Sequence, residues 1–348
     1  MFEAMLGVEV GDDVMFEDPT VLELQRRCAE LFNKEDALFI ATGTMGNLVS
    51  AMTHCTERGQ EAIMGKSNHM FLYEVGGLAQ IAGIHTNTLT NRGDGTIDIT
   101  EVRENIRNPD DDHMPRTKLI CMENSHNRCG GLVIPLSHFQ EVRQLADEHG
   151  LVVHLDGARI LNACIAQGVA AKAYTGYTDS VNMCFSKGLG APVGSIIAGT
   201  ADFCRAARKV RKALGGGMRQ VGVLAAAALY ALDNNVVRLE DDHQRAKQLA
   251  KAIKEHGGHM AEVNMDTVHT NIAYFKLLKK DVVNAAQMVE RLNQVTDEEK
   301  KMLGFSAIVQ TLAFSETVVR LVCHINNSTE DIEMAVAKLR YVLEEMNQ

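Results

Sequence analysis

The sequence lacks the features that mark membrane-spanning and secreted proteins. No apolar run approaches the roughly twenty residues that a membrane span needs, and the nearest, residues 221–232, is far too short. The N-terminus has no basic region followed by an apolar one, as a secretory signal would. These absences predict a cytoplasmic protein with no membrane partner.

Motifs for metals, nucleotide phosphates and nucleic acids are also missing. The eight cysteines are scattered without C-x-x-C or zinc-like spacing, which fits reduced thiols, and the thirteen histidines form no H-E-x-x-H. The glycine-containing segment 42–47 is not followed by the Gly-Lys-Ser/Thr of a Walker loop. With 35 basic and 45 acidic residues the net charge is −10, which argues against a nucleic-acid partner. We therefore expect no metal site and no nucleic-acid function.

What the chain does have is enough length and apolar content for a large core. Its 348 residues, 46% of them hydrophobic, allow two domains. Helical patterns at 236–256 and 282–293 alternate with short strands at 270–277 and 318–325. The sequence thus predicts a large domain over 1–234 and a smaller α+β domain over 235–348. The latter ends in a helix over 328–346, which Ser328 and Asp331 begin as a capping-box variant.

In the large domain, apolar runs alternate with helical patterns, as in an α/β fold with a mostly parallel central sheet. An antiparallel strand is expected at 194–198. A strongly basic helix is expected at 201–214, and a charged helix face of this kind is usually solvated. The remaining predicted elements are helices at 20–33 and 98–106 and strands at 37–41, 61–65, 118–123 and 151–156.

Two strands of this sheet end in residues that suggest a cofactor. The apolar run 181–185 leads to Lys187 in a glycine-rich turn, and the buried strand 151–156 ends in Asp156. Both side chains fall at the carboxyl edge of an open α/β sheet, where such sheets bind ligands. A lysine that attacks an aldehyde and a carboxylate that keeps a pyridine nitrogen protonated are the two groups that pyridoxal 5'-phosphate (PLP) needs. A surface lysine and a capping aspartate are the simpler alternatives.

Motifs spread over nearly the whole chain resemble those of the threonine aldolase family, which are PLP-dependent enzymes of fold type I. Any one of the motifs is weak, but eight in the family's order form a strong signal. They are VGDDVxxEDPT at 10–20, TGTMGN at 42–47, HMFLYEVGG at 69–77, ENSHN at 123–127, HLDGAR at 154–159, SKGLGAPVGS at 186–195, GGGMRQVG at 215–222 and VVRLVCHIN at 318–326.

The resemblance implies a role for several further residues around the cofactor. Gly43 and Thr44 are expected at a helix N-terminus that binds the cofactor phosphate, although a simple helix cap is the alternative. His69 takes the position of the histidine that stacks on the PLP ring. The ENSHN segment closes a strand at the same edge, where its side chains hold either the cofactor or the surrounding loops.

The resemblance also implies how substrate and a second subunit are engaged. Arg320 and Arg159 are expected to orient the substrate carboxylate, with an internal salt bridge as the alternative for Arg320. His113 aligns with a histidine near the substrate hydroxyl, with an exposed loop histidine as the alternative. Lys212 and Arg219 match residues that reach the phosphate of a neighbouring subunit, which implies a dimer at least and a homotetramer as the usual state.

The implied reaction is cleavage of a β-hydroxy amino acid, L-threonine or L-allo-threonine, to glycine and acetaldehyde. Its catalytic base is His69, His113 or a bound water. The family's opening DLRSDTVT segment has no counterpart here, and its VYGEDP is replaced by VMFEDP at 14–19. A weakly active or inactive truncated homologue is therefore one alternative function, and a related PLP-dependent β-eliminating lyase is another.

Overall fold

A computed structural model describes residues 1–347, which form two compact units. The first contains residues 1–129 and 133–237, and the second contains 130–132 and the chain from Arg238 onward. The domain boundary predicted after residue 234 thus falls after Val237. Within the described residues, no helix combines the length and the apolar content needed to cross a membrane.

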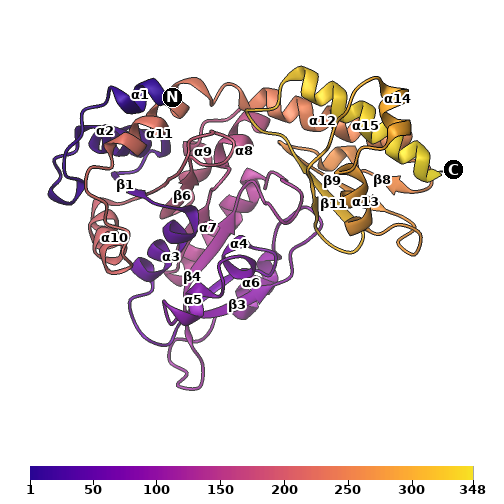
Figure 1. Ribbon diagram of the computed structural model, residues 1–348. Coiled ribbons are helices and arrows are strands. Elements are labelled where there is room, and N and C mark those ends of the chain that lie inside the picture. Colours follow the sequence, from indigo (N-terminus) through magenta and orange to yellow (C-terminus); the bar gives the residue numbers. More distant parts are fainter. Residues whose placement is uncertain (348) are drawn as a thin grey trace. The chain divides into compact units, whose positions relative to one another are not determined.

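The first unit is built on a seven-stranded sheet with the order β1-β7-β6-β5-β4-β2-β3 (Figure 1). Neighbouring strands run parallel from β6 through β5, β4 and β2 to β3, whereas β7 is antiparallel to both β6 and β1. This confirms the predicted mostly parallel sheet and the antiparallel strand after it. The strands are β1 Asp36–Ile40, β2 Gln60–Gly65, β3 His85–Leu89, β4 Arg116–Glu123, β5 Val152–Asp156, β6 Ser180–Cys184 and β7 Ser195–Gly199.

Consecutive residues of β2, β6 and β7 are buried, so the sheet is covered on both faces. Such strands read as continuous apolar runs, which is why the sequence reveals most of them. The helices of this unit are α1 Phe2–Leu6, α2 Pro19–Phe32, α3 Gly43–His54, α4 His69–Leu72, α5 Gly77–Gln80, α6 Ile99–Asn105, α7 Leu136–His149, α8 Ile160–Gln167, α9 Lys172–Thr175, α10 Ala201–Ala213 and α11 Gly222–Asn234, with a short 3-10 helix η1 at Asp13–Met15.

Three neighbouring parallel strands end together at the carboxyl edge of this sheet. Glu123, the last residue of β4, pairs in register with Asp156, the last of β5, which in turn pairs with Asn182 of β6. The turn that carries Lys187 follows β6 directly. The topology therefore brings side chains from distant parts of the chain to one edge.

The charged face of the basic helix α10 is not solvated along its whole length, and Arg211 departs most from the prediction. Arg211 is only 1% exposed: its Nη2 donates to Asp13 Oδ2 at 2.7 Å and its Nη1 donates to the Phe39 carbonyl at 2.7 Å. Its charge is buried because it is paired with a carboxylate about two hundred positions away in the chain. The expectation of a solvated charged face is wrong for this arginine.

The second unit contains a four-stranded antiparallel sheet with the order β10-β11-β9-β8, packed with helices around its own apolar core. The last helix begins as predicted, because Ser328 N donates to Asp331 Oδ2 and Asp331 N donates to Ser328 Oγ. The elements are α12 Leu239–His256, β8 Ala261–Glu262, η2 Met265–Thr267, β9 Ile272–Leu277, α13 Ala285–Leu292, α14 Asp297–Leu303, β10 Leu312–Ala313, β11 Val318–Val322 and α15 Thr329–Asn347.

Candidate active site

Asp156 is a buried carboxylate at the end of β5 and is held by neutral donors. It is 2% exposed; Asn47 Nδ2 donates to its Oδ2 at 3.0 Å and the Ala158 backbone N–H donates to its Oδ1 at 3.1 Å. Among residues 1–347 it makes no ion pair within 4.0 Å. A buried negative charge without a cationic partner calls for a positive group from a ligand.

His69 lies beside Asp156 and forms a hydrogen bond with a second carboxylate, that of Glu74. Its Nδ1 is 3.0 Å from Glu74 Oε1. One imidazole nitrogen of His69 and one carboxylate oxygen each of Glu74 and Asp156 all lie within 4.8 Å of one another. The hydrogen bond that His69 donates to Glu74 is the largest cause that raises the pKa of His69, and burial raises the pKa of Glu74. Both shifts have the same sense: the pair takes up a proton more readily than separate side chains would.

Lys187 sits in the turn after β6 and is half-buried. Its charge lowers the pKa of His69, whereas the charge of Asp156 raises it, so both groups act on the same imidazole. The same two charges also act in opposite senses on the Cys184 thiol. The predicted amine thus lies in the turn after β6, the strand that pairs with the Asp156 strand, at the same edge of the sheet.

The N-terminus of α3 lies close against β6, where only glycine fits. A Cβ on Gly43 would come 2.6 Å from Cys184 Sγ, and one on Gly46 would come 2.5 Å from Asn182 Oδ1. The helix is capped by Thr42, whose side chain accepts from Met45 N, while Thr44 is exposed. The capping role considered for Thr44 thus belongs to Thr42, and the exposed first turn keeps the N–H groups that bind anions.

The ENSHN segment mainly fixes the loops around the site. Glu123 accepts from the His69 backbone N–H at 2.7 Å and from the Asn127 backbone N–H at 2.8 Å. His126 is 3% exposed, with Nε2 at 3.3 Å from Asn91 Nδ2. Glu123 therefore couples the position of the His69 loop to the end of β4.

The four predicted basic residues occupy different parts of the structure. Arg159 is half-buried at the start of α8, directly after the Asp156 strand, and Arg320 lies on β11 of the second unit with its guanidinium 5.8 Å from the Phe314 ring centre. Lys212 and Arg219 are exposed, and Arg219 Nη1 donates to Asp12 Oδ2 at 2.6 Å. That Arg159 and Arg320 together bind the substrate carboxylate stays a prediction, because the two residues belong to different units.

His113 is not brought to the site of its own chain. It precedes β4 at the amino edge of the sheet, its side chain is 92% exposed, and its Nδ1 is 3.0 Å from Asp111 Oδ1. The eight residues of β4 separate this edge from Glu123 by about 26 Å at ~3.3 Å per residue. The exposed loop histidine, the alternative considered for this residue, is what the structure contains.

The sequence interpretation missed the polar residues behind the carboxylates, among them Asn47, Glu74, Asn182 and His154. Asn47, Glu74 and His154 lie in motifs that the sequence does contain, but the partners of all four residues are set only by the fold. A polar residue within an otherwise buried strand, such as His154 or Asn182, was the available signal.

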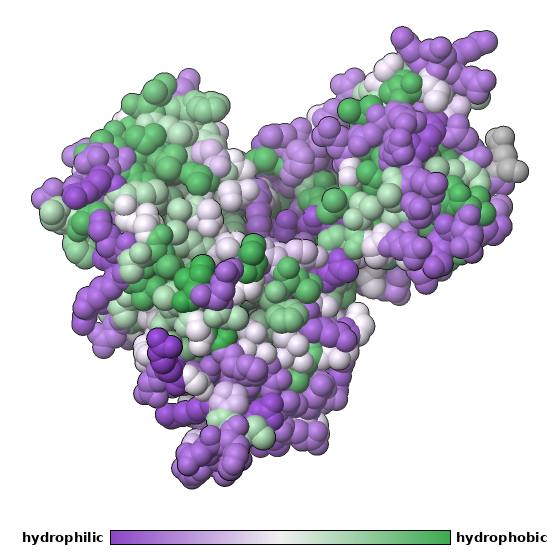
Figure 2. All heavy atoms as spheres, turned by 60° about the horizontal axis from the view of Figure 1, so that its bottom comes forward, coloured by the Kyte–Doolittle hydropathy of each residue, from purple (hydrophilic) through white to green (hydrophobic). Residues whose placement is uncertain are grey.

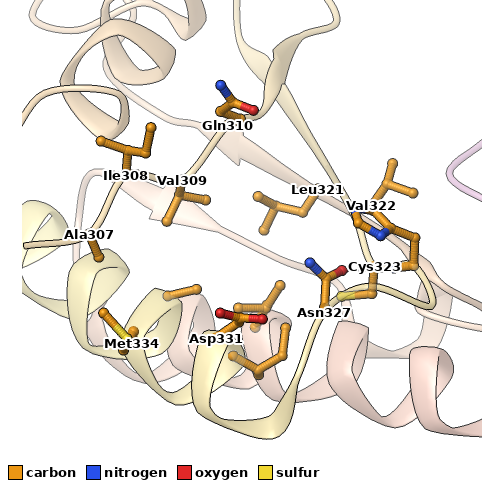
Figure 3. A pocket seen from close by; sticks show the side chains of 14 residues that line it. Ala307, Ile308, Val309, Gln310, Leu321, Val322, Cys323, Asn327, Asp331 and Met334 are labelled. Carbon is orange, nitrogen blue, oxygen red and sulfur yellow. Dashed lines mark hydrogen bonds between the residues drawn. The ribbon is translucent and has the colours of Figure 1, made fainter.

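A cavity in the second unit contains none of the predicted site residues. It has a volume of about 490 Å³ and lies between segment 307–310, the end of β11 and α15 (Figure 3). Apolar side chains such as Val309 and Leu321 line it, with Asn327 and Asp331 beside them. The chemistry of the site in the first unit does not depend on it.

The residues at the sheet edge fit PLP by their chemistry. A buried carboxylate lacking a cation, an amine in the turn after the next strand, an imidazole beside the carboxylate and a glycine-lined helix N-terminus supply one group for each part of that cofactor. The fold and the site together define a PLP-dependent enzyme of fold type I.

Comparison with known proteins narrows this class to a family. The beta-eliminating lyase family model matches residues 1–278. A probable low-specificity L-threonine aldolase 2 of Arabidopsis thaliana is 43% identical over 97% of this chain and 91% of its own, and the low specificity L-threonine aldolase of Escherichia coli K12 is 39% identical over 99% and 95%. The chain belongs to the threonine aldolase family within the beta-eliminating lyases.

A solved structure supports the fold independently. That of a putative L-allo-threonine aldolase from Listeria monocytogenes aligns with a TM-score of 0.79 over 97% of this chain and 91% of its own, at 19% identity. At this identity the similarity concerns the fold.

Proposed function

We propose that the protein is a PLP-dependent carbon–carbon lyase that cleaves L-threonine or L-allo-threonine to glycine and acetaldehyde. The observation that carries the proposal is the meeting of Lys187, His69 and the buried Asp156 carboxylate at one sheet edge, in a chain similar over its full length to low-specificity L-threonine aldolases. When bound, PLP supplies an electron sink for the bond that breaks.

The chain's own residues hold and orient the reactants. Lys187 would hold the cofactor aldehyde, Asp156 its ring nitrogen, and the first turn of α3 at Gly43 and Thr44 its phosphate. His69 would lie against the ring, where Glu74 and the Glu123 bond to its backbone fix its orientation. Arg159 and Arg320 would orient the substrate carboxylate through charge-assisted hydrogen bonds.

Cleavage requires a base that removes the proton of the β-hydroxyl group while the Cα–Cβ bond breaks. Of the two histidines considered for this role, His69 lies at the site and His113 does not. We assign the proton transfer to His69 or to a water that it positions.

We further infer that the site is completed by a second copy of the chain. Lys212 and Arg219 are exposed on either side of the glycine segment 215–217, where they are available to a partner's phosphate. Apolar surface gathers at the left of Figure 2, the side on which Figure 1 places α1 and α11, and Phe2 and Leu6 of α1 are 81% and 88% exposed. A patch of this kind favours association between copies.

The test is an assay for glycine and acetaldehyde with purified protein and PLP, on threonine and on allo-threonine. We expect both products, and loss of at least about a thousandfold in rate in K187A, because the amine that holds the cofactor is gone. Pyruvate and ammonia in place of glycine would instead identify a β-eliminating lyase. No turnover by the wild-type protein with bound PLP would overturn the proposal.

A further inference from the structure

A continuous chain of largely buried hydrogen bonds runs behind Asp156, through residues that are not among the predicted site residues. His54 Nε2 is 2.7 Å from Ser180 Oγ, which is 2.8 Å from His154 Nδ1. His154 Nε2 is 3.2 Å from Asn47 Oδ1. Asn47 Nδ2 then reaches both Glu74 Oε1, at 2.8 Å, and Asp156 Oδ2, at 3.0 Å.

The Asn47 amide uses its full hydrogen-bonding capacity. Its Oδ1 accepts from Asn182 Nδ2 at 2.8 Å as well as from His154, and its two N–H groups meet the two carboxylates. Asn182 is itself oriented, because its Nδ2 also donates to the Gly43 carbonyl at 2.9 Å and a carbonyl only accepts. The oxygen of Asn47 therefore faces the two donors, and its NH₂ group faces Asp156 and Glu74.

The polarity of the rest of the chain follows from this orientation. His154 must carry a hydrogen on Nε2 to donate to Asn47 Oδ1. Because complete burial lowers the pKa of His154 to about 4, its ring is neutral and Nδ1 is an acceptor. The Ser180 hydroxyl then donates to His154 Nδ1 and accepts from His54 Nε2–H, and burial likewise lowers the pKa of His54 to about 3. Every donor thus points toward the carboxylates.

We propose that Asn47 is a positioning residue of the cofactor site: held by the His54–Ser180–His154 chain, it directs one N–H group to Asp156 and the other to Glu74. The inference rests on the proposed function, since Asp156 is the residue that would hold the cofactor nitrogen and Glu74 the one that orients His69. The amide neither gains nor loses a proton at neutral pH, so the chain orients these groups and does not conduct protons between them.

One side chain therefore sets two features of the site at once. It fixes the position of the Asp156 carboxylate through the hydrogen bond to Oδ2, and it holds Glu74 in place against His69 Nδ1. The two carboxylates lie within 4.8 Å and would repel if both were ionised without a shared donor. Asn47 supplies that donor without adding a charge that would compete with the cofactor's ring nitrogen.

The experiment measures PLP affinity by the visible absorption of the bound cofactor in N47D and S180A, with S50A as matched control. N47D replaces the shared donor by a third carboxylate and is expected to weaken PLP binding at least about tenfold. S180A cuts the chain two hydrogen bonds away from the carboxylates and is expected to weaken it about threefold. Ser50 is a fully buried serine on α3 whose Oγ has no hydrogen-bond partner among residues 1–347, so S50A should bind PLP like wild type.

If N47D does not fold, the comparison of S180A with S50A decides. Equal PLP affinity of S180A, S50A and wild type, or N47D within about twofold of wild type, would overturn the proposal. A wild-type protein that binds no PLP would instead contradict the proposed function.

A second readout needs no cofactor. In apo-protein labelled with ¹⁵N-histidine, the chain requires neutral His154 and His54 at pH 7, each with its hydrogen on Nε2. S180A should change the tautomer balance of His154, whereas S50A should not. Protonation of His154 on Nδ1 in the wild-type protein would overturn the hydrogen-bond polarity on which the proposal depends.

Discussion

Glu299 of the second unit and Asp156 of the first unit are buried carboxylates with opposite kinds of partner. In the second unit, Glu299 is fully buried and forms ion pairs with two cations: Lys338 Nζ lies 2.5 Å from Oε1 and Arg291 Nη1 lies 2.9 Å from Oε2. In the first unit, Asp156 is as deeply buried but is held by an amide and a backbone N–H, both neutral. The charge of Glu299 is balanced by the two cations, whereas the charge of Asp156 is left for a ligand to balance.

This difference separates a structural charge from a functional one. The charges of a buried ion pair balance each other and need no ligand. Removing one partner of such a pair therefore lowers the free energy of unfolding. A buried carboxylate that is stabilised only by neutral donors can bind a positively charged group of a ligand. Removing this carboxylate therefore lowers ligand affinity and reaction rate. The sequence contains both kinds of carboxylate, and their partners tell them apart.

The largest expected effect comes from removing the charge of Asp156 while keeping its shape. D156N should lower kcat for threonine cleavage about a thousandfold, or ~4 kcal/mol, because a neutral amide does not stabilise a positive ring nitrogen. Its unfolding free energy should stay close to wild type, since no ion pair is lost. Steady-state kinetics with saturating PLP, together with urea unfolding of the apo-protein, measure both quantities. A stable variant with wild-type kcat would contradict a functional role for the Asp156 charge.

In the second unit the same kind of substitution should act on stability. E299Q should lower the unfolding free energy by about 3 kcal/mol, because it strands the buried charge of Lys338. The double variant E299L/K338M should lose less than E299Q, since no uncompensated charge remains. Urea titration gives the energies. A loss of kcat per folded molecule in E299Q would show that this network is not purely structural.

Glu74 offers a test that depends on pH. The pKa of His69 is raised in the folded protein, so the pair stabilises the fold below the unfolded histidine value of about 6.5, and this contribution is lost as pH rises through the raised folded value. E74Q should therefore destabilise the apo-protein by about 1 kcal/mol near pH 6 and by less near pH 9. The control is E333Q on an exposed glutamate of α15, and an E74Q effect independent of pH would contradict the assigned pairing.

The smallest effect concerns backbone strain beside the site. Val75, which follows Glu74, has φ 55° and is 85% exposed, an unfavourable conformation for a β-branched residue. V75G should raise the unfolding free energy by about 0.5 kcal/mol, the net of relieved strain and added chain entropy. V282G, at an exposed valine without positive φ, should instead lower it. Destabilisation by V75G would mean that this side chain makes contacts that outweigh the strain.

Much of the fold could be predicted because buried parallel strands are apolar along their whole length and end in recognisable turns. Asp156 and Lys187 were found for this reason, since each follows such a run. Asn47 and Glu74 could not be found from local pattern, because their partners are set by how α3 and the loop after α4 meet the sheet. Arg211 looked solvated for the same reason: its partner Asp13 is remote in sequence. His113 shows the converse, a residue aligned with a family histidine that the topology places at the other edge of the sheet.

The central claim is that Lys187 and Asp156 hold the two ends of one cofactor ring. The most direct measurement is to reduce the PLP-loaded protein with borohydride and locate the cofactor by peptide mass spectrometry, in wild type, K187A and D156N. We predict modification of Lys187 alone in wild type, none in K187A, and lower occupancy at the same lysine in D156N at limiting PLP. Modification of a different lysine, or of none, would contradict the account.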